Sequence, residues 1–529
     1  MQNISSLLNK KKETFYTIII FLFSISINQY YGNLGVCPID SFWFFNSGYD
    51  SLKGYYPFKD YWTIAGPFIT FTQAIFFKLL GVSWFSYVFH ASVFNFLISI
   101  VTFYTLLKFK LRSEYCLLYS LLISILAYPS AGTPYVDHHA SILSIISLLI
   151  FILAIKTNSK IYWFFLPIVL VVSFLTKQTP TGNIFLIISF LSCVYFAINF
   201  DFKKILLGFL GSFAIISFFF FILFLTEISF ESFYEQYILF PLSIGKTRVE
   251  YFLFPLEFSR IFLRYKLIHI PLFILIFISF VKIKSDLKYL KSNDFLIIVS
   301  LILASYIFIA HQLMTINGMF IFFVIPILGA FLHIYFFEQY KSKKYILYFF
   351  IILTICSSLH YGYKYIHKRD FMDLRNVNFD KAIDANMLDH KLNGLKWISC
   401  LKPNDSKKEI TNLIDSINVI KNDMRVKGII TEYQFISVIL DKYDYSPTQV
   451  WFINHVVNEN KDSRFFKSYK KLLVNKIKKH EIEVFYLIKP FWNDDKIFEK
   501  GLSKNCYKKT KLNEILDVYQ LQECDDFKS

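Results

Sequence analysis

Apolar runs long enough to cross a lipid bilayer follow one another through most of the first 361 residues of this 529-residue chain. About 20 apolar residues span a hydrocarbon core of roughly 30 Å, so repeated runs of this length favour a bundle of membrane helices. The composition agrees, because 55% of the residues are hydrophobic, against about 45–50% in average soluble domains. We expect eleven spans, at about 14–30, 84–107, 113–129, 139–155, 160–176, 180–199, 204–226, 267–283, 294–312, 315–336 and 345–361.

The charge of the connecting loops predicts how these spans are oriented, because cytoplasmic loops are enriched in Lys and Arg. With a cytoplasmic N-terminus, the cytoplasmic loops carry Lys10–Lys12, Lys108, Lys110, Arg112, Lys156, Lys160, Lys203, Lys204, Lys282, Lys284, Lys288, Lys291, Lys341, Lys343 and Lys344. The alternate turns at 130–138 and around 313 carry no Lys or Arg, and the turn at 177–179 carries one. We therefore expect a multi-pass protein of the plasma (inner) membrane whose N-terminus is cytoplasmic.

The apolar stretch 66–80 needs a separate decision, because counting it as a span would reverse the orientation of every later loop. It is short, contains Gln73 and Lys78, and ends at Gly81. We interpret it as an amphipathic helix on the outer membrane surface. The first outer loop then covers residues 31–83, a second large outer loop covers 227–266, and residues 1–361 form one transmembrane domain.

After Tyr361 the chain becomes polar, with short apolar segments and charges of both signs. A helix-like pattern at 465–479, followed by the strand-like sequence VFYLI at 484–488, predicts a small α/β domain over residues 362–529. An odd number of spans places this soluble domain on the extracytoplasmic side. The expected fold class is a multi-pass α-helical membrane protein, with about eleven transmembrane helices and a C-terminal extracytoplasmic α/β domain.

The seven cysteines divide into two groups. Cys116, Cys193 and Cys356 fall in apolar spans, whereas Cys37, Cys400, Cys506 and Cys524 fall outside them. No pair has the spacing of zinc ligands. In an oxidising compartment the second group can form a disulfide, and the sequence leaves its pairing open.

The net charge of +17 does not predict a nucleic-acid partner. The basic residues lie mainly in short turns between apolar runs and in a tail that is also rich in acidic residues. We expect the lipid bilayer as a partner and no nucleic acid.

Two acidic residues of the first outer loop are candidate catalytic groups. Asp40 lies shortly after the first span, and Asp60 lies just before the surface helix, both among aromatic residues that suit the membrane interface. A carboxylate near an apolar surface is costly unless it pairs, binds a cation or acts on a substrate. Either residue could serve as a general base. The alternative is that they cap helices or face water.

This segment resembles the first extracytoplasmic loop of the GT-C glycosyltransferases, which include protein O-mannosyltransferases and lipid A aminoarabinose transferases. The resemblance rests on Asp40, on the stretch GYYPFKD at 54–60, on Gly66-Pro67-Phe68, and on Gly81-Val82-Ser83 before the second span. The family often has Asp-Glu at the first acidic site, whereas Ser41 follows Asp40 here. The resemblance implies a GT-C catalytic domain over residues 1–361, a polyprenyl-phosphate-linked sugar donor, Asp40 as the catalytic base, and inversion at the anomeric carbon.

A second group of ionisable residues, Asp137, His138 and His139, lies at the outer end of the third span. These side chains could bind the donor phosphate, orient the acceptor, or hold a divalent cation together with a loop carboxylate. Adjacent residues rarely all reach one metal ion, so a complete metal site is not expected. A capping Asp beside two interfacial histidines is the alternative.

Basic residues on the outer side are candidates for binding the phosphate of a lipid carrier. Lys177 is the basic residue of its turn, where the leaving phosphate needs a cation and the next span begins with free backbone amides. Arg260 and Arg264 are four apart, so on a helix they share one face and could clamp a phosphate. Snorkelling and contacts with anionic headgroups are the alternatives. Lys246, Arg248 and Lys266 lie in the same outer loop, which thus carries more positive charge than outer loops usually do. His311 and Gln312, at the outer end of the ninth span, are weaker candidates.

The sequence contains no Gly-rich phosphate loop, no Asp-x-Asp nucleotide-sugar motif and no hydrolase elbow. We predict an inverting glycosyltransferase that moves a sugar from a polyprenyl-phosphate carrier to a lipid, glycan or protein acceptor on the extracytoplasmic face. No cofactor is required, and a divalent cation is compatible with the site. The alternatives are a transporter or flippase of lipid-linked sugars, which would favour ionisable residues midway through the spans, and a polymerase or ligase of lipid-linked sugars.

Overall fold

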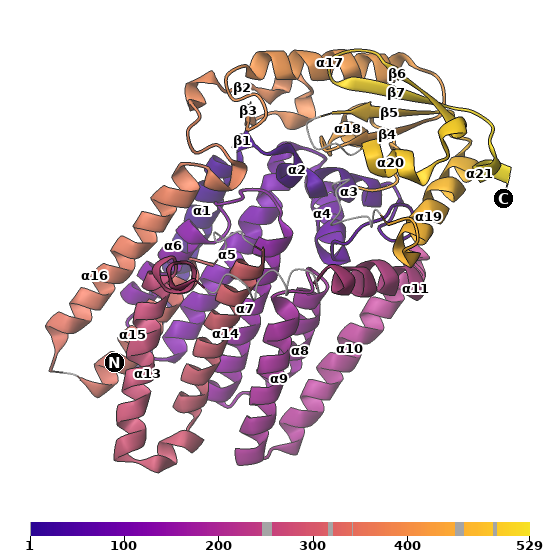
Figure 1. The fold of residues 1–529 in the computed structure, drawn as a ribbon. Coiled ribbons are helices and arrows are strands. Elements are labelled where there is room, and N and C mark those ends of the chain that lie inside the picture. Colours follow the sequence, from indigo (N-terminus) through magenta and orange to yellow (C-terminus); the bar gives the residue numbers. More distant parts are fainter. Residues whose placement is uncertain are drawn as a thin grey trace.

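The computed structural model describes residues 2–245, 257–315, 321–340, 342–449, 460–489 and 495–528. A bundle of long helices carries an α/β region over one of its ends (Figure 1). This arrangement confirms the predicted fold class of a helical multi-pass membrane protein with a C-terminal α/β region.

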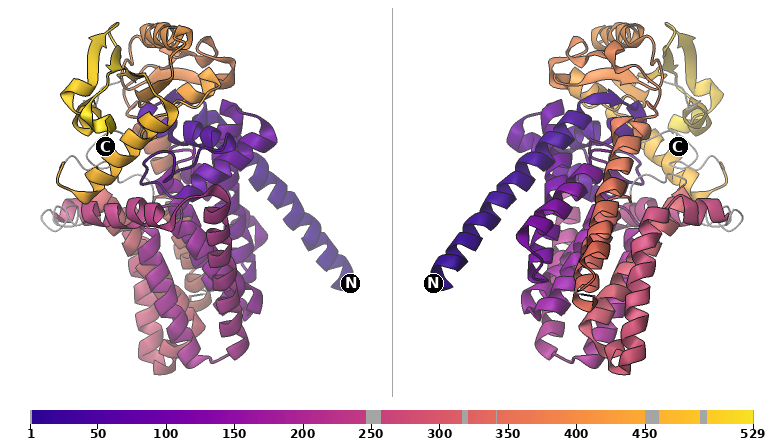
Figure 2. Two further views of the ribbon diagram at one scale, coloured as in Figure 1. Left: turned by 90° about the vertical axis from the view of Figure 1, so that its right-hand side faces the viewer. Right: turned by 90° about the vertical axis from the view of Figure 1, so that its left-hand side faces the viewer.

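Within the described residues, eleven helices occupy the eleven predicted spans. They are α1 (Gln2–Gly32), α5 (Trp84–Lys108), α6 (Ser113–Leu126), α7 (Val136–Thr157), α8 (Lys160–Phe174), α9 (Thr181–Ile198), α10 (Phe202–Thr226), α13 (Lys266–Ser285), α14 (Asn293–Thr315), α15 (Val324–Gln339) and α16 (Lys344–Tyr361). Figure 2 shows α1 leaning away from the other helices toward its N-terminal end. The tenth span was predicted to begin too early, because Ile321–Phe323 are apolar and buried but form a turn.

Seven described segments are long and apolar enough to cross a membrane: α5, α7, α9, α10, α13, α14 and the segment Lys344–Met372 that begins with α16. Helices α6, α8 and α15 are apolar but shorter, and α1 is in neither group. Burial differs sharply among them, since 83% of the most apolar stretch of α7 is buried against 11% for α10. Helix α7 is therefore central, and α10 presents apolar side chains where lipid would lie.

The first outer loop folds into β1 (Leu34–Val36), α2 (Pro38–Ser41), α3 (Trp43–Leu52) and α4 (Pro67–Leu80). These elements lie at the end of the bundle that carries the C-terminal strands, whereas η3 (Leu287–Lys291), a lysine-bearing connection between α13 and α14, lies at the opposite end (Figure 1). Helix α4 covers the predicted surface helix and packs on α3 and α5. The described part of the second outer loop contains α11 (Phe230–Phe233), η1 (Tyr234–Leu239) and η2 (Ser259–Leu263).

The C-terminal region begins with short helical turns and continues as an α/β fold. Its helices are η4 (Gly362–His367), η5 (Asp370–Met372), η6 (Phe379–Lys381), η7 (Ala385–Met387), η8 (His390–Leu392), α17 (Ser406–Asn422), α18 (Ile436–Leu440), α19 (Arg464–His480), α20 (Asp495–Gly501), η9 (Lys504–Cys506) and α21 (Asp525–Lys528). Its strands are β2 (Ile383–Asp384), β3 (Lys396–Ser399), β4 (Lys427–Thr431), β5 (Val484–Ile488), β6 (Tyr507–Lys511) and β7 (Leu516–Leu521). Helix α19 and strand β5 confirm the helix and strand predicted there.

The strands form two sheets, and one of them joins the outer loop to the C-terminal region. The four-stranded sheet has the order β4-β5-β7-β6, with β4 parallel to β5 and the other pairs antiparallel. The three-stranded sheet has the order β1-β3-β2. Strand β1 runs parallel to β3, with Leu34 opposite Lys396 and Val36 opposite Ser399. The first outer loop is therefore built into the C-terminal region by backbone pairing.

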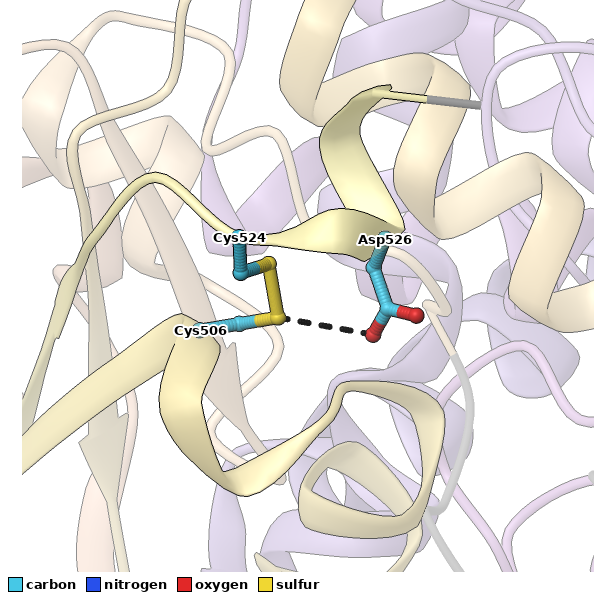
Figure 3. A group of neighbouring side chains, drawn as sticks. All are labelled: Cys506, Cys524 and Asp526. Atoms are coloured by element: carbon cyan, nitrogen blue, oxygen red, sulfur yellow. Dashed lines mark hydrogen bonds between the residues drawn. A yellow bond between two sulfur atoms is a disulfide. The ribbon is translucent and has the colours of Figure 1, made fainter.

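Cys506 and Cys524 form a disulfide beside Asp526 (Figure 3). This is one of the pairings that the sequence leaves open. Among the described residues, these three side chains are the one group of His, Cys, Asp and Glu whose spacing could suit a metal ion. The sulfurs are bonded to each other and are not thiolates, so this group is not a metal site.

Cys37 and Cys400 are expected to form a second disulfide in an oxidising compartment. They follow the paired strands β1 and β3, are free thiols, and have Sγ atoms 3.9 Å apart. A small approach would reach bonding geometry. After incubation with a disulfide oxidant such as oxidised glutathione, peptide mapping should find Cys37 linked to Cys400. Cys116, buried in α6, should remain open to alkylation after denaturation. Free alkylation of Cys37 and Cys400 after the same treatment would contradict this expectation.

Candidate active site

Asp40 lies on the short helix α2, which follows directly from β1. Pro38 begins this helix, where its fixed φ suits the first helical position. The backbone amide of Asp40 donates to the carbonyl oxygen of Cys37 at 3.0 Å. Because β1 is paired with β3, the start of α2 is fixed relative to the C-terminal region. The Asp40 side chain is partly exposed.

The surroundings of the Asp40 carboxyl disfavour its charged form. Loss of solvation among the surrounding protein atoms, followed by the charges of Asp137 and Asp373, raises the pKa of Asp40 to about 7. A hydrogen bond with Tyr135 acts in the opposite direction. A general base is most effective when its pKa lies near the working pH. Asp40 can therefore take up a proton at neutral pH.

Asp137 is the centre of an ion-pair cluster that gathers three separate parts of the bundle. Its Oδ1 atom accepts from Nζ of Lys177 at 2.6 Å and from Nε2 of His311 at 3.0 Å. Asp137 begins α7, His311 lies near the end of α14, and Lys177 lies between α8 and α9. The side chains of Asp137 and His311 are 3% and 1% exposed, whereas that of Lys177 is 21% exposed. The cluster thus has one cation that solvent or a ligand can reach.

The turn that carries Lys177 is held against both outer loops. The amide of Gln178 donates to the carbonyl oxygens of Ile64, at 3.4 Å, and Tyr237, at 2.5 Å. The backbone amide of Gly66 donates to Thr176 at 3.2 Å. A Cβ atom at Gly66 would lie only 2.0 Å from the carbonyl oxygen of Leu175, so this close approach requires glycine. The glycine of the Gly-Pro-Phe sequence therefore positions the Lys177 turn.

The three ionisable residues at the start of α7 face different partners. His138 hydrogen-bonds through Nε2 with Ser130 Oγ, and His139 hydrogen-bonds through Nδ1 with the Tyr128 hydroxyl. The other ring nitrogen of His139 lies 3.1 Å from Nε2 of His90, inside the bundle. Asp137 alone joins the Lys177 cluster. His138 and His139 are therefore not brought together with Asp137 at one ligand position.

Asp60 lies in different surroundings from Asp40. Its Oδ2 atom accepts from the backbone amide of Tyr56 at 2.7 Å, which closes a local turn. Its carbonyl oxygen accepts from the Tyr443 hydroxyl at 3.2 Å, and its charge acts on Lys476 and His480 of the C-terminal region. This geometry supports the alternative interpretation of Asp60 as a capping residue.

Arg260 and Arg264, the arginines of the second outer loop that the structure describes, are exposed. Arg260 lies on η2, 3.6 Å from Glu257 Oε2, and the backbone carbonyl of Arg264 accepts from the Tyr361 hydroxyl. Lys246 and Arg248 lie outside the described residues.

Arg369 is a buried residue that the sequence analysis did not single out. Its guanidinium donates to the carbonyl oxygens of Leu34 at 3.0 Å, Pro129 at 2.8 Å, Ser130 at 3.3 Å and Ala131 at 3.3 Å. It thereby ties β1, just before Asp40, to the loop that leads into α7. Its sequence signal is slight, since an Arg soon after the last span looks like an ordinary interfacial residue.

Arg369→Gln is expected to lower the melting temperature by more than about 5 °C, because it leaves several buried carbonyl groups without their charged donor. The matched control is Arg375→Gln. Arg375 is half exposed and pairs with Asp370 at the surface, so its loss should change the melting temperature by about 1 °C or less. The melting temperatures of the wild type and of both variants are measured by thermal unfolding of the detergent-purified chain. Equal effects of the two variants would contradict a structural role of Arg369.

Three comparisons with known proteins were made. The sequence matches no protein-family model and no curated protein. Three solved structures of the oligosaccharyltransferase of Archaeoglobus fulgidus are similar to the chain. The complex with Zn and sulfate gives a TM-score of 0.49 at 13% identity, covering 89% of this chain and 68% of that one. The apo form gives a TM-score of 0.46 at 11% identity, and the match covers 90% of this chain and 69% of that chain. The third structure is tethered through a disulfide bond to an acceptor peptide containing the NVT sequon. It gives a TM-score of 0.46 at 12% identity, and the match covers 91% of this chain and 70% of that chain.

Proposed function

We propose that this chain is a membrane glycosyltransferase of the GT-C class. In this proposal it transfers a sugar from a polyprenyl-phosphate carrier to a lipid, glycan or protein acceptor at the extracytoplasmic face, with inversion. The observation that carries the proposal is the shared neighbour Asp137. It pairs with the accessible cation Lys177, and its charge acts on Asp40, whose pKa is raised to about 7. A candidate proton acceptor and an accessible cation therefore both interact with one buried carboxylate.

The proposed reaction is a single displacement. Asp40 takes the proton from the acceptor hydroxyl or amide as that atom attacks the anomeric carbon. The bond from the anomeric carbon to the phosphate oxygen breaks, and the electron pair leaves with the polyprenyl phosphate. Lys177 offsets the negative charge that develops on this phosphate. His311 bonds the same Oδ1 atom of Asp137 and so helps to fix the carboxylate that holds Lys177.

A divalent cation in this proposal would meet the Asp40 carboxylate, because Asp137 is paired with Lys177 and His311 and, within the described residues, the carboxylates of this site do not form a group at metal-ligand spacing. Carboxylate oxygens suit such an ion. When bound, it would supply further positive charge for the donor phosphate. His138 and His139 face other partners and would not contribute.

The proposal is tested by incubating the reconstituted full chain with radiolabelled sugars linked to polyprenyl phosphate, together with a membrane extract as the source of acceptors. We expect the label to move from the carrier to an acceptor. Passage of the labelled lipid across the bilayer with no sugar transfer would contradict the proposal and favour a flippase.

The rate of transfer should depend on pH through Asp40. The base is the deprotonated carboxylate, and its pKa is about 7. The value of kcat/KM should therefore rise about tenfold per pH unit below pH 7 and level off above it. A pH–rate profile in liposomes of constant composition provides the measurement. A profile that is flat between pH 5 and pH 8 would show that Asp40 is not the base.

A further inference from the structure

A buried polar cluster joins the first outer loop to the C-terminal region, apart from the Asp137 cluster. Asn46 and Asp50 are four residues apart on α3, so they share one face of that helix. This face packs on α18, which carries Ser437, and meets Asp444 and Gln449 of the segment that follows. All five side chains are at least 96% buried, with Asp444 the most exposed at 4%.

The hydrogen bonds of this cluster run between amides and carboxylates. Nδ2 of Asn46 donates to Asp444 Oδ2 at 3.1 Å and to Ser437 Oγ at 3.2 Å. Nε2 of Gln449 donates to Asp50 Oδ2. Each amide thus places its NH₂ group on a carboxylate and leaves its oxygen for another partner.

Three oxygen atoms of the cluster have no hydrogen-bond partner. They are Oδ1 of Asn46, Oδ1 of Asp50 and Oε1 of Gln449, and their side chains are all fully buried. A buried polar atom without a partner costs about 1–3 kcal/mol, so three in one cluster indicate a missing ligand. All three are acceptors, and the ligand must therefore supply positive charge or donors.

The charges in the cluster also indicate a cation. Two acidic side chains, those of Asp50 and Asp444, are buried in this one cluster. The buried ammonium group of Lys476, whose charge acts on Asp50 and Asp444, donates to the Tyr443 hydroxyl and to the carbonyl oxygen of Ser446, both at 2.7 Å. Burial lowers the pKa of Lys476 to about 8. These hydrogen bonds of Lys476 thus go to other groups and not to the two acidic side chains of the cluster.

We propose that Asn46, Asp50, Asp444 and Gln449 bind a hard divalent cation that fastens α3 to the C-terminal region. Carboxylate and amide oxygens are the ligands that Ca²⁺ takes in flexible, irregular sites. The ion would satisfy the three free oxygens and neutralise the two carboxylates. A half-turn of either amide would also bring its oxygen toward a carboxylate, where both oxygens could bind the same cation. The site is independent of the proposed transfer reaction.

The first test uses the full chain in detergent, stripped with EDTA and dialysed. Addition of Ca²⁺ to about 1 mM, within the range of weak extracellular sites, should raise the melting temperature by about 2 °C. Isothermal titration calorimetry should give a stoichiometry of one Ca²⁺ per chain. The same measurements with Mg²⁺ form the second arm of the test, because Mg²⁺ demands a stricter octahedral geometry. If neither ion binds nor shifts the melting temperature, the proposal is overturned.

The second test locates the ion with Asp50→Asn and Asp444→Asn. Either change should abolish the Ca²⁺-dependent shift. In EDTA, Asp50→Asn should melt at or above the wild-type temperature, because it removes one of two buried like charges. Asp415→Asn removes an exposed carboxylate of α17 and should keep the full shift. Retained one-site Ca²⁺ binding in both Asp50→Asn and Asp444→Asn would place the ion elsewhere and overturn the proposal.

Discussion

Replacing Asp40 by Asn is expected to lower sugar transfer about 10²–10⁴-fold, the usual contribution of a general base. Asn has nearly the same shape but cannot take up the proton of the acceptor. The loss should appear in kcat, and the rise of rate with pH toward 7 should disappear, because the titrating carboxyl is gone. Single-turnover transfer from a radiolabelled polyprenyl-phosphate donor measures both effects.

The control for Asp40→Asn is Asp415→Asn, which changes an exposed carboxylate on α17. The two variants should show equal expression and equal melting behaviour within about 2 °C, so that lost activity reflects chemistry. Undiminished transfer by Asp40→Asn at matched expression would remove Asp40 from the catalytic role.

Replacing Lys177 by Met is expected to lower kcat about 10²–10³-fold, the usual cost of losing one group that stabilises developing negative charge. Met retains much of the length and apolar character of Lys, and His311 still binds Asp137. Lys177→Arg keeps the positive charge and should recover part of the rate. KM should rise less than kcat falls, because the leaving phosphate gains charge in the transition state.

The matched control for Lys177 is Lys53→Met, which removes an exposed lysine of the first outer loop that lies 3.8 Å from Asp441. Its transfer rate should stay within about twofold of wild type, since exposed ion pairs contribute little. If Lys53→Met and Lys177→Met lost equal activity, the loss would reflect general charge at this face and not a phosphate-binding role of Lys177.

The helical part of the fold could be predicted because each crossing requires its own apolar run. Hydropathy therefore locates α5, α7 and α10 to within a few residues. It fails where apolar residues form a turn, as at Ile321–Phe323, since composition does not distinguish a buried turn from a helix. A helical pattern and a short strand-like apolar run also located α19 and β5.

The partners within the site could not be predicted, because they depend on how the helices pack. The sequence identified Asp137 and Lys177 as candidates, and gave His311 less weight, but only the packing of α7, α8 and α14 shows that the three meet. Asp60 carried a strong sequence signal, yet its carboxylate closes a local turn. His90 is an ionisable residue within a span, a signal that could have led to its contact with His139.

Arg369 illustrates a further limit. Its four acceptors come from β1 and from the loop before α7, and none is near it in the sequence. Backbone carbonyl oxygens are present at every residue, so no residue type marks the positions that a buried guanidinium will bind. Contacts of this kind are decided by tertiary structure alone.

The most direct test of the account is an experimental structure of the full chain with a non-transferable polyprenyl-phosphonate sugar analogue. We expect the phosphonate oxygens within hydrogen-bonding distance of Lys177 Nζ, with the anomeric carbon facing the Asp40 carboxyl. An analogue bound away from both residues, or a sugar facing away from Asp40, would contradict the central claim that these two groups act on one donor.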